Sequence, residues 1–169
     1  MKPTKHSLSV AYLIATWFKS GLLPKAPGTM GSLATLPLAF VMIYFYGTLG
    51  IAVSAVLIFI LGLKATQIVL KDSIDDQDPG FVVVDETVGQ LLAFLFVAHL
   101  PINLWAYIFG FAFFRIFDII KKGPVGYCDK NFHGAFGVMF DDVIAGLMAA
   151  GCLWILYYIY PPLIVGTIF

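Results

Sequence analysis

Charged residues are scarce in this chain. Asp, Glu, Lys and Arg make up only 12% of its 169 residues, whereas 60% are hydrophobic and the mean hydropathy is +0.93. A soluble domain has about 25% charged and about 45–50% apolar residues. The composition therefore excludes an ordinary soluble domain and predicts a membrane protein. The length suits one membrane-embedded domain over residues 1–169.

Other features are also scarce or missing. Cys128 and Cys152 are the only cysteines, and their spacing fits neither a disulfide framework nor a metal motif, so we predict free thiols. The net charge of +0 excludes a bulk preference for nucleic acid. Residues 8–18 are apolar after a basic start, but no small-x-small cleavage site follows. We therefore predict an N-terminal amphipathic helix lying against the membrane or the protein.

Three long stretches contain no charged residue, and about 20 apolar residues are enough to span a bilayer as a helix. The sequence "GTLG" at residues 47–50 and "HLPIN" at residues 99–103 are expected to fold the first two stretches into hairpins, and Pro161–Pro162 to end the third. The predicted fold is all-α, a polytopic helical membrane protein with about five short transmembrane helices plus the N-terminal amphipathic helix. The charge-free stretches are residues 26–63, 87–114 and 143–169.

The charged windows between these stretches predict the orientation. Basic loops favour the cytoplasm, so both hairpins should begin and end on that side, and the last helix should begin there. The arms of the first hairpin have roughly 15 residues each, about 22 Å against a lipid core of about 30 Å. They are expected to use flanking residues, to thin the bilayer, or to span it incompletely. One long helix over residues 31–63 would instead put the N-terminal motif on the opposite side.

Two acidic pairs are predicted at helix starts. Asp85 and Glu86 open one helix, and Asp141 and Asp142 open another. Carboxylates at such positions are often simple caps that interact with the helix dipole. Two pairs facing one compartment favour a hard-cation site, because Mg²⁺ prefers carboxylate oxygens and keeps water for a substrate phosphate.

Cationic and anion-binding groups are predicted near the same surface. Arg115 and Asp118 share a helix face, and Lys121 follows; they form either an intrahelical ion pair with a snorkelling lysine or a phosphate clamp. The sequence "PGTMGS" at residues 27–32 opens a helix whose amides could hold an anion, with Lys25 close by, or is only a flexible turn. His133 is a general acid, a ligand or an ordinary loop histidine.

Together these segments resemble the phosphatidylglycerophosphatase A family. The resemblance runs from about residue 21 to residue 146 and is carried by "GLLPKAPGTMGSLATLP", "VVDETVG" and "FRIFDIIKKGPVGYCDKNFHGAFGVMFDDVIAG". One departure is visible: "KKGP" stands where the family often has Lys-Pro-x-Pro. The residues at the family's motif positions are Pro27, Gly28, Thr29, Gly31, Ser32, Asp85, Glu86, Arg115, Asp118, Lys121, Asp129, His133, Asp141 and Asp142.

The resemblance implies a Mg²⁺-dependent enzyme of phospholipid biosynthesis in the bacterial inner membrane. It would remove the terminal phosphate of phosphatidylglycerophosphate at the cytoplasmic leaflet and give phosphatidylglycerol. The chain lacks the Asp-x-Asp pair of aspartyl phosphatases at Asp85–Thr87, which favours direct attack by water. The expected catalytic residues are Asp85, Glu86, Asp141, Asp142 and His133; the expected phosphate ligands are Lys25, Thr29, Ser32, Arg115 and Lys121; and the expected metal ligands are Asp85, Glu86, Asp118, Asp141 and Asp142.

Three other functions are compatible with parts of the pattern. A small ion-coupled membrane transporter would use intramembrane acids, but these acids are predicted at helix ends. In a non-enzymatic scaffold the acids would have no role. A phosphotransferase acting on CDP-activated lipid would need an Asp-Gly-x-x-Ala-Arg pattern, which is absent. The number of metal ions, the identity of the base and the oligomeric state stay open.

Overall fold

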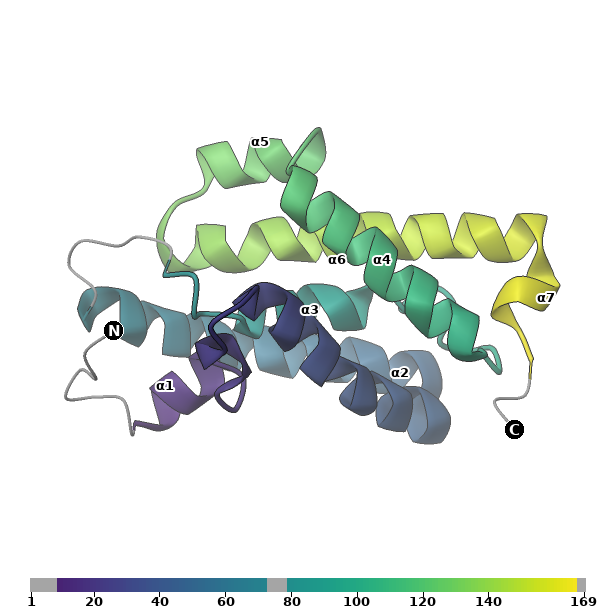
Figure 1. Cartoon of the computed structure of the whole chain (residues 1–169), viewed down its shortest axis with the longest axis horizontal. Helices are drawn as coiled ribbons and strands as arrows, with labels where there is room; N and C mark the ends of the chain where they lie inside the picture. Colours follow the sequence, from purple (N-terminus) through teal and green to yellow (C-terminus); the bar gives the residue numbers. More distant parts are fainter. Residues whose placement is uncertain (1–8, 73–78, 167–169) are drawn as a thin grey trace.

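The computed structural model describes residues 9–72 and 79–166. These residues form helices and turns, with no strand beyond one isolated bridge between Ile102 and Val165, so the all-α prediction is confirmed (Figure 1). A short 3₁₀ turn covers Ser20–Leu22. The α-helices are α1 (Val10–Ala15), α2 (Pro27–Asp72), α3 (Val84–Leu92), α4 (Leu104–Ile120), α5 (Pro124–Asn131), α6 (Gly134–Ile159) and α7 (Pro161–Ile164).

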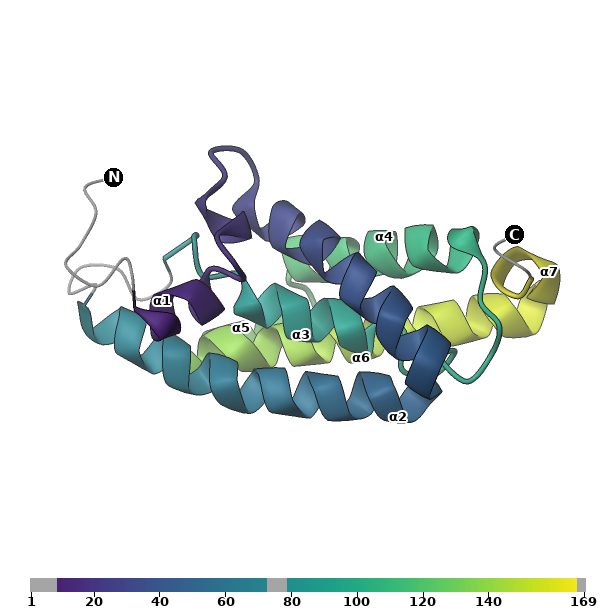
Figure 2. The same cartoon turned by 90° about the horizontal axis from the view of Figure 1, so that it is seen from below.

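Helix α2 is folded back on itself at Gly47, as "GTLG" predicts (Figure 2). Gly47 has φ 56° and ψ −141°, a conformation that is open to glycine and strained for other residues. The alternative of one straight helix over residues 31–63 is therefore wrong. The second arm continues to Asp72, so its helix includes charged residues beyond the charge-free stretch.

The number of long apolar helices differs from the prediction. Among the described residues only α2 and α6 are long and apolar enough to cross a membrane, rather than about five helices. Helix α3 has only 9 residues because the chain then tightens into turns with i→i+3 hydrogen bonds. Phe94 N–H donates to the Leu91 carbonyl at 3.1 Å, and Val97 N–H donates to that of Phe94 at 3.1 Å. Helix α4 has 17 residues.

Helix α6 starts earlier than the acidic pair suggests. It begins at Gly134 and ends at Ile159, just before Pro161–Pro162, as predicted. Asp141 and Asp142 therefore lie two turns inside the helix and not at its start. They cannot be caps, because their own backbone groups already lie within the helical ladder. The prediction of a second acidic helix start was wrong.

Helix α3 lies at the centre of the bundle, packed against α2, α4 and α6 (Figures 1 and 2). Its Val84, Val88 and Leu91 side chains are buried in the main core. The outer faces of the long helices carry exposed apolar side chains, such as Tyr44 and Ile60 on α2. A core closed around α3 therefore leaves an apolar exterior of the kind that suits lipid.

The N-terminal helix packs on the protein. Val83 N–H donates to the Ala15 carbonyl at 2.9 Å, and the Tyr12 and Phe81 rings lie 5.4 Å apart. Helix α1 therefore supports the turn that leads into α3. The basic residues before Leu8 and the acidic loop at Asp75, Asp76 and Asp78 lie outside the described residues.

Candidate active site

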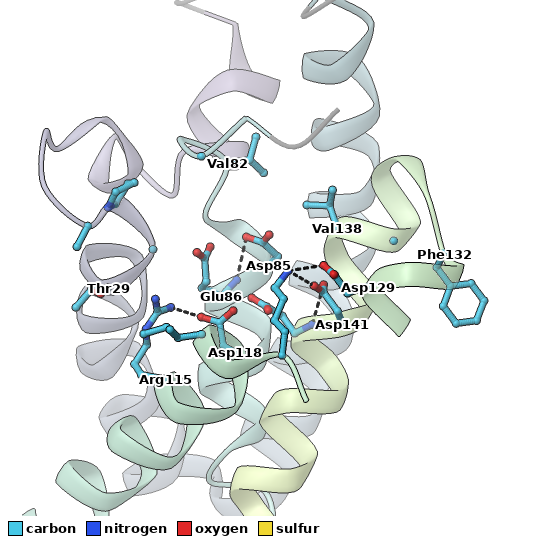
Figure 3. A pocket seen from close by; sticks show the side chains of 18 of the residues that line it. Thr29, Val82, Asp85, Glu86, Arg115, Asp118, Asp129, Phe132, Val138 and Asp141 are labelled. Atoms are coloured by element: carbon cyan, nitrogen blue, oxygen red, sulfur yellow. Dashed lines mark hydrogen bonds and ion pairs between the residues drawn. The ribbon is translucent and has the colours of Figure 1, made fainter. Parts of the chain in front are cut away.

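Polar residues from five parts of the chain meet in one cavity of about 550 Å³ (Figure 3). It is formed by the start of α2, the start of α3 with the turn before it, the end of α4, the end of α5 with the loop after it, and the first half of α6. Ionisable residues on its wall are Asp85, Glu86, Arg115, Asp118, Lys121, Asp129, His133, Asp141 and Asp142. Segments that are far apart in the sequence therefore share one pocket.

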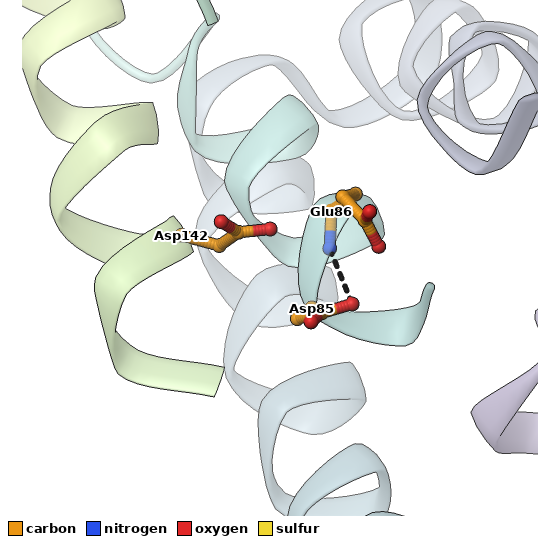
Figure 4. Close-up of side chains that lie close together, drawn as sticks. All are labelled: Asp85, Glu86 and Asp142. Carbon is orange, nitrogen blue, oxygen red and sulfur yellow. Dashed lines mark hydrogen bonds between the residues drawn. The ribbon is translucent and has the colours of Figure 1, made fainter. Parts of the chain in front are cut away.

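Three carboxylates in this cavity form a group that we call the carboxylate trio: Asp85 and Glu86 of α3, and Asp142 of α6 (Figure 4). One oxygen from each lies within 4.8 Å of the others. Glu86 Oε2 and Asp142 Oδ2 are inaccessible to solvent and have no hydrogen-bond partner. Leaving buried carboxylate oxygens unpaired is unfavourable, and a hard cation would satisfy them. The donor set, all carboxylate oxygen, fits Mg²⁺.

Burial raises the pKa of Glu86 from 4.5 to about 8, and the nearby carboxylates of Asp142 and Asp118 also raise it. The cause is the cost of concentrating negative charge in a site with little solvent. Without a cation, Glu86 therefore holds its proton near neutral pH. A metal ion would have to displace that proton when it binds.

Asp141 lies apart from the trio, although it is adjacent to Asp142 in the sequence. Its Oδ2 accepts from Lys121 Nζ at 2.8 Å, and its Oδ1 accepts from the Asp142 backbone N–H at 3.0 Å. Lys121 Nζ also pairs with Asp129 at 2.6 Å. Burial opposes the lysine charge, but these two ion pairs raise the pKa of Lys121, so it stays cationic. Asp141 therefore anchors a lysine at the cavity wall.

Arg115 forms the intrahelical ion pair that the sequence suggests, and it also lines the cavity. Its Nη1 pairs with Asp118 Oδ2 at 2.6 Å and donates to Ser32 Oγ at 3.3 Å, while the guanidinium lines the cavity. Asp118 also lies beside Asp142, which links the pair to the trio. Ser32 is fully buried and does not line the cavity. It donates to the Gly28 carbonyl at 2.9 Å and supports Arg115 from behind.

The remaining predicted residues are divided between the cavity and the surface. Thr29 and His133 line the cavity, and His133 is exposed and caps α6 without a side-chain hydrogen bond. Lys25 is exposed and is not part of the cavity wall. His99 is exposed in the turn between α3 and α4 and does not line the cavity.

Sequence reasoning missed the apolar part of the wall and the contact that joins α3 to α6. Val82, Ile119 and Val138 line the cavity beside the charged groups, and Phe132 contributes while its ring points away from them (Figure 3). Helices α3 and α6 touch at Gly89 and Gly146. The available signal was a repeated Asp-x-x-x-Gly, present once in each helix.

The sequence model of the phosphatidylglycerophosphatase A family matches residues 13–157. Phosphatidylglycerophosphatase A of Escherichia coli is 36% identical over 151 residues, which cover 89% of this chain and 85% of that protein. The Haemophilus influenzae protein of the same name is 36% identical over 152 residues, 89% of this chain and 91% of its own. This chain belongs to the phosphatidylglycerophosphatase A family, as the motifs predict.

A third relative has a different name. A Bacteroides thetaiotaomicron protein, named a putative phosphatidylinositol-3-phosphatase, is 40% identical over 139 residues, 80% of this chain and 86% of its own. All three names describe phosphatases that act on lipid phosphomonoesters. No solved structure matches the chain.

Proposed function

We propose that this protein is a Mg²⁺-dependent lipid phosphatase that hydrolyses the terminal phosphomonoester of phosphatidylglycerophosphate to phosphatidylglycerol. Its membership of the family and the names of its Escherichia coli and Haemophilus influenzae relatives support this activity. The observation that carries the proposal is the carboxylate trio, which shares a cavity with Arg115. A metal site beside a phosphate-binding cation is the arrangement that phosphomonoester hydrolysis needs.

The balance of charge in the cavity supports a role for a cation. The wall carries more carboxylates than cations, with Arg115 and Lys121 both already paired to acids. A phosphate would be repelled unless further positive charge were present. Bound to Asp85, Glu86 and Asp142, Mg²⁺ would supply that charge and lower the pKa of a water molecule.

The phosphate would be held by groups on two sides of the cavity. Arg115 keeps donors that Asp118 and Ser32 do not use, since both bonds are made by Nη1, and a guanidinium binds phosphate through two parallel N–H groups. Thr29 lies in the first turn of α2, where backbone amides attract anions. Lys121 can exchange its exposed partner Asp129 for a phosphate oxygen.

Hydrolysis requires proton transfer at two positions. The water oxygen forms a bond to phosphorus while the bond from phosphorus to the glycerol oxygen breaks. In this proposal a carboxylate of the trio would accept the proton of the attacking water, and His133, which lines the cavity, would donate one to the departing oxygen. The products are phosphatidylglycerol and inorganic phosphate.

We further propose that the chain is a multi-pass membrane protein held by α2 and α6, with the cavity at the cytoplasmic leaflet. The apolar outer faces of the long helices and the lysines near the cavity support this placement. A lipid could then keep its acyl chains in the bilayer while its head group enters the cavity. The ion-coupled transporter is not favoured, because the acids gather at one wall and family membership points to a phosphatase.

The name of the Bacteroides thetaiotaomicron relative supports phosphatidylinositol 3-phosphate as a second candidate substrate. Both head groups are phosphomonoesters, so the same trio would serve either one. The substrates differ in what surrounds the phosphate, glycerol or inositol, and the apolar wall at Ile119 and Val138 would contact that part.

The test is phosphate release by the detergent-purified protein from each of the two lipids, with Mg²⁺ and with a chelator. We expect metal-dependent release from phosphatidylglycerophosphate, faster than from phosphatidylinositol 3-phosphate. Release from neither lipid would overturn the phosphatase proposal. Faster release from the inositol lipid would overturn the proposed substrate, and equal release in chelator would overturn the metal requirement.

A further inference from the structure

The backbones of α3 and α6 touch at a pair of glycines. A Cβ atom added to Gly146 would lie 2.3 Å from the carbonyl oxygen of Gly89 and 2.9 Å from its Cα. A Cβ atom added to Gly89 would lie 2.7 Å from the Asp142 carbonyl oxygen. These neighbours are backbone atoms, so a change of side-chain rotamer cannot make room. Any side chain at Gly146 must therefore push the two helices apart.

Each glycine follows an acid of the carboxylate trio by four residues. Asp85 precedes Gly89 on α3, and Asp142 precedes Gly146 on α6. Four residues are about one helical turn, so acid and glycine share a face of their helix. Where the glycine faces touch, the two acids face each other one turn away, as in Figure 4.

We infer that Gly146 and Gly89 are positioning residues, whose backbone contact sets the spacing of the carboxylate trio for a small divalent cation. The inference rests on the proposed function, in which the trio holds Mg²⁺. Magnesium demands oxygen ligands at about 2.0–2.1 Å in near-octahedral geometry, whereas Ca²⁺ accepts about 2.3–2.6 Å in flexible geometry. Separating α3 from α6 should therefore weaken Mg²⁺ binding more than Ca²⁺ binding.

The same helix provides a matched control. Gly151 also lies in α6, but a Cβ atom added there meets nothing within 4 Å. Alanine is a better helix former than glycine, so both Gly146→Ala and Gly151→Ala favour the helix itself. Only Gly146→Ala alters the contact with α3. A loss of metal binding confined to this variant then reflects spacing and not helix formation.

The experiment is calorimetric titration of Mg²⁺ and, separately, Ca²⁺ into the detergent-purified full chain, with helix content checked by circular dichroism. We expect Gly146→Ala to weaken Mg²⁺ binding by about tenfold or more and Ca²⁺ binding by less, and Gly151→Ala to match the wild type. Adding Asp142→Glu to Gly146→Ala lengthens one ligand by a methylene group. That double variant should recover part of the Mg²⁺ affinity.

The inference would be overturned if Gly146→Ala bound Mg²⁺ with wild-type affinity. It would also be overturned if folded Gly146→Ala lost affinity for Mg²⁺ and Ca²⁺ by the same factor. Should Gly146→Ala lose helix content, Gly89→Ala combined with Phe114→Leu tests the contact from α3, since the Phe114 ring is the other neighbour of that Cβ. The same selective loss is expected there, and its absence would overturn the inference. No Mg²⁺ binding by the wild type would instead contradict the proposed function.

Discussion

Asp141 and Asp142 show how strongly adjacent residues can differ in their surroundings. Consecutive residues of a helix point about 100° apart, so Asp142 joins the carboxylate trio while Asp141 pairs with Lys121. Both oxygens of Asp141 have donors, whereas Asp142 Oδ2 has no partner. We therefore assign Asp142 to metal binding and Asp141 to holding Lys121 in place.

This difference predicts unequal effects of two identical substitutions. Asp142→Asn removes a proposed metal ligand and should lower Mg²⁺-dependent phosphate release by about 100-fold or more, or about 3 kcal/mol of barrier. Asp141→Asn should keep metal binding but lower the free energy of unfolding by about 1 kcal/mol, because Lys121 loses a partly exposed ion pair. Phosphate release and thermal melting measure the two effects. Equal metal affinity in wild type and Asp142→Asn would contradict the assignment.

The raised pKa of Glu86 predicts that metal binding depends on pH. Its pKa is about 8 without metal, so below that pH a cation must displace a proton. Apparent Mg²⁺ affinity should rise by up to about tenfold per pH unit until about pH 8 and then level off. Calorimetry in buffers of different ionisation heat should detect about one proton released per ion. Glu86→Gln should abolish this release, and a wild-type affinity independent of pH would exclude the predicted role.

The same raised pKa sets the sign of the effect on stability. A group that binds its proton more tightly when folded stabilises the fold below its unfolded pKa, here 4.5, and this stabilisation is lost as pH rises through about 8. The metal-free protein should therefore melt at lower temperature above about pH 8 than near neutral pH. Saturating Mg²⁺ should remove this decline, since the ion takes the place of the proton.

At the scale of elements, sequence reasoning predicted chain reversals better than helix ends. Gly47 and Pro161–Pro162 restrict or free the backbone locally, whatever packs around them. The bend and the helix end are both found where these residues predict them. The charged segments between the charge-free stretches instead show where polar groups gather in the fold. These positions need not be the ends of helices. Helix α6 therefore runs through Asp141 and Asp142 from Gly134, and both acids line the cavity from inside the helix, where Asp141 pairs with Lys121.

Helix α3 was mispredicted for a different reason. Residues 91–98 are all apolar, and residues 87–98 carry neither a charge nor a proline, so the sequence favours a continuous helix. The chain instead turns after Leu92, packed between α2, α4 and α6. The glycine contact with α6 is equally invisible to local patterns, since it depends on two segments more than 50 residues apart. Tertiary packing overrides propensity at these positions.

The backbone conformation at the bend in α2 predicts that position 47 requires glycine. Gly47→Ala should lower the free energy of unfolding by about 1–3 kcal/mol, since φ 56° with ψ −141° is strained for any residue with a Cβ atom. Gly151→Ala, at an open helical position, should be neutral or slightly stabilising. Thermal melting in detergent compares the two variants. A Gly47→Ala variant as stable as wild type would mean that the bend does not depend on this conformation.

At the scale of the whole molecule, the polar cavity and the chain reversals lie at different ends. The bend at Gly47 contacts Ala98, and the turn at Ile102 pairs with Val165. The described residues around these reversals carry no charge, whereas the ionisable wall gathers at the start of α2 and α3. The windows of charged residues in the sequence predicted this separation, and it is the basis of the orientation that we propose for the chain in a bilayer.

The proposed orientation can be measured with single cysteines. Cys128 is buried and therefore unsuitable for labelling. A single cysteine is instead introduced at the exposed residue Lys130 or Leu49, in a chain whose own cysteines have been replaced. Lys130→Cys, near the cavity, should react with an impermeant thiol reagent only after the membrane is opened. Leu49→Cys, at the bend, should react in intact cells whose outer membrane is permeabilised. The opposite pattern would place the cavity outside.

The most direct test of the site is to locate a bound Mn²⁺ ion, used in place of Mg²⁺, by its anomalous X-ray scattering in crystals of the full chain. The predicted position is between α3 and α6, with oxygens of Asp85, Glu86 and Asp142 as ligands. An ion held elsewhere, or a trio without an ion at saturating Mn²⁺, would contradict the claim that these three carboxylates form the metal centre of the phosphatase.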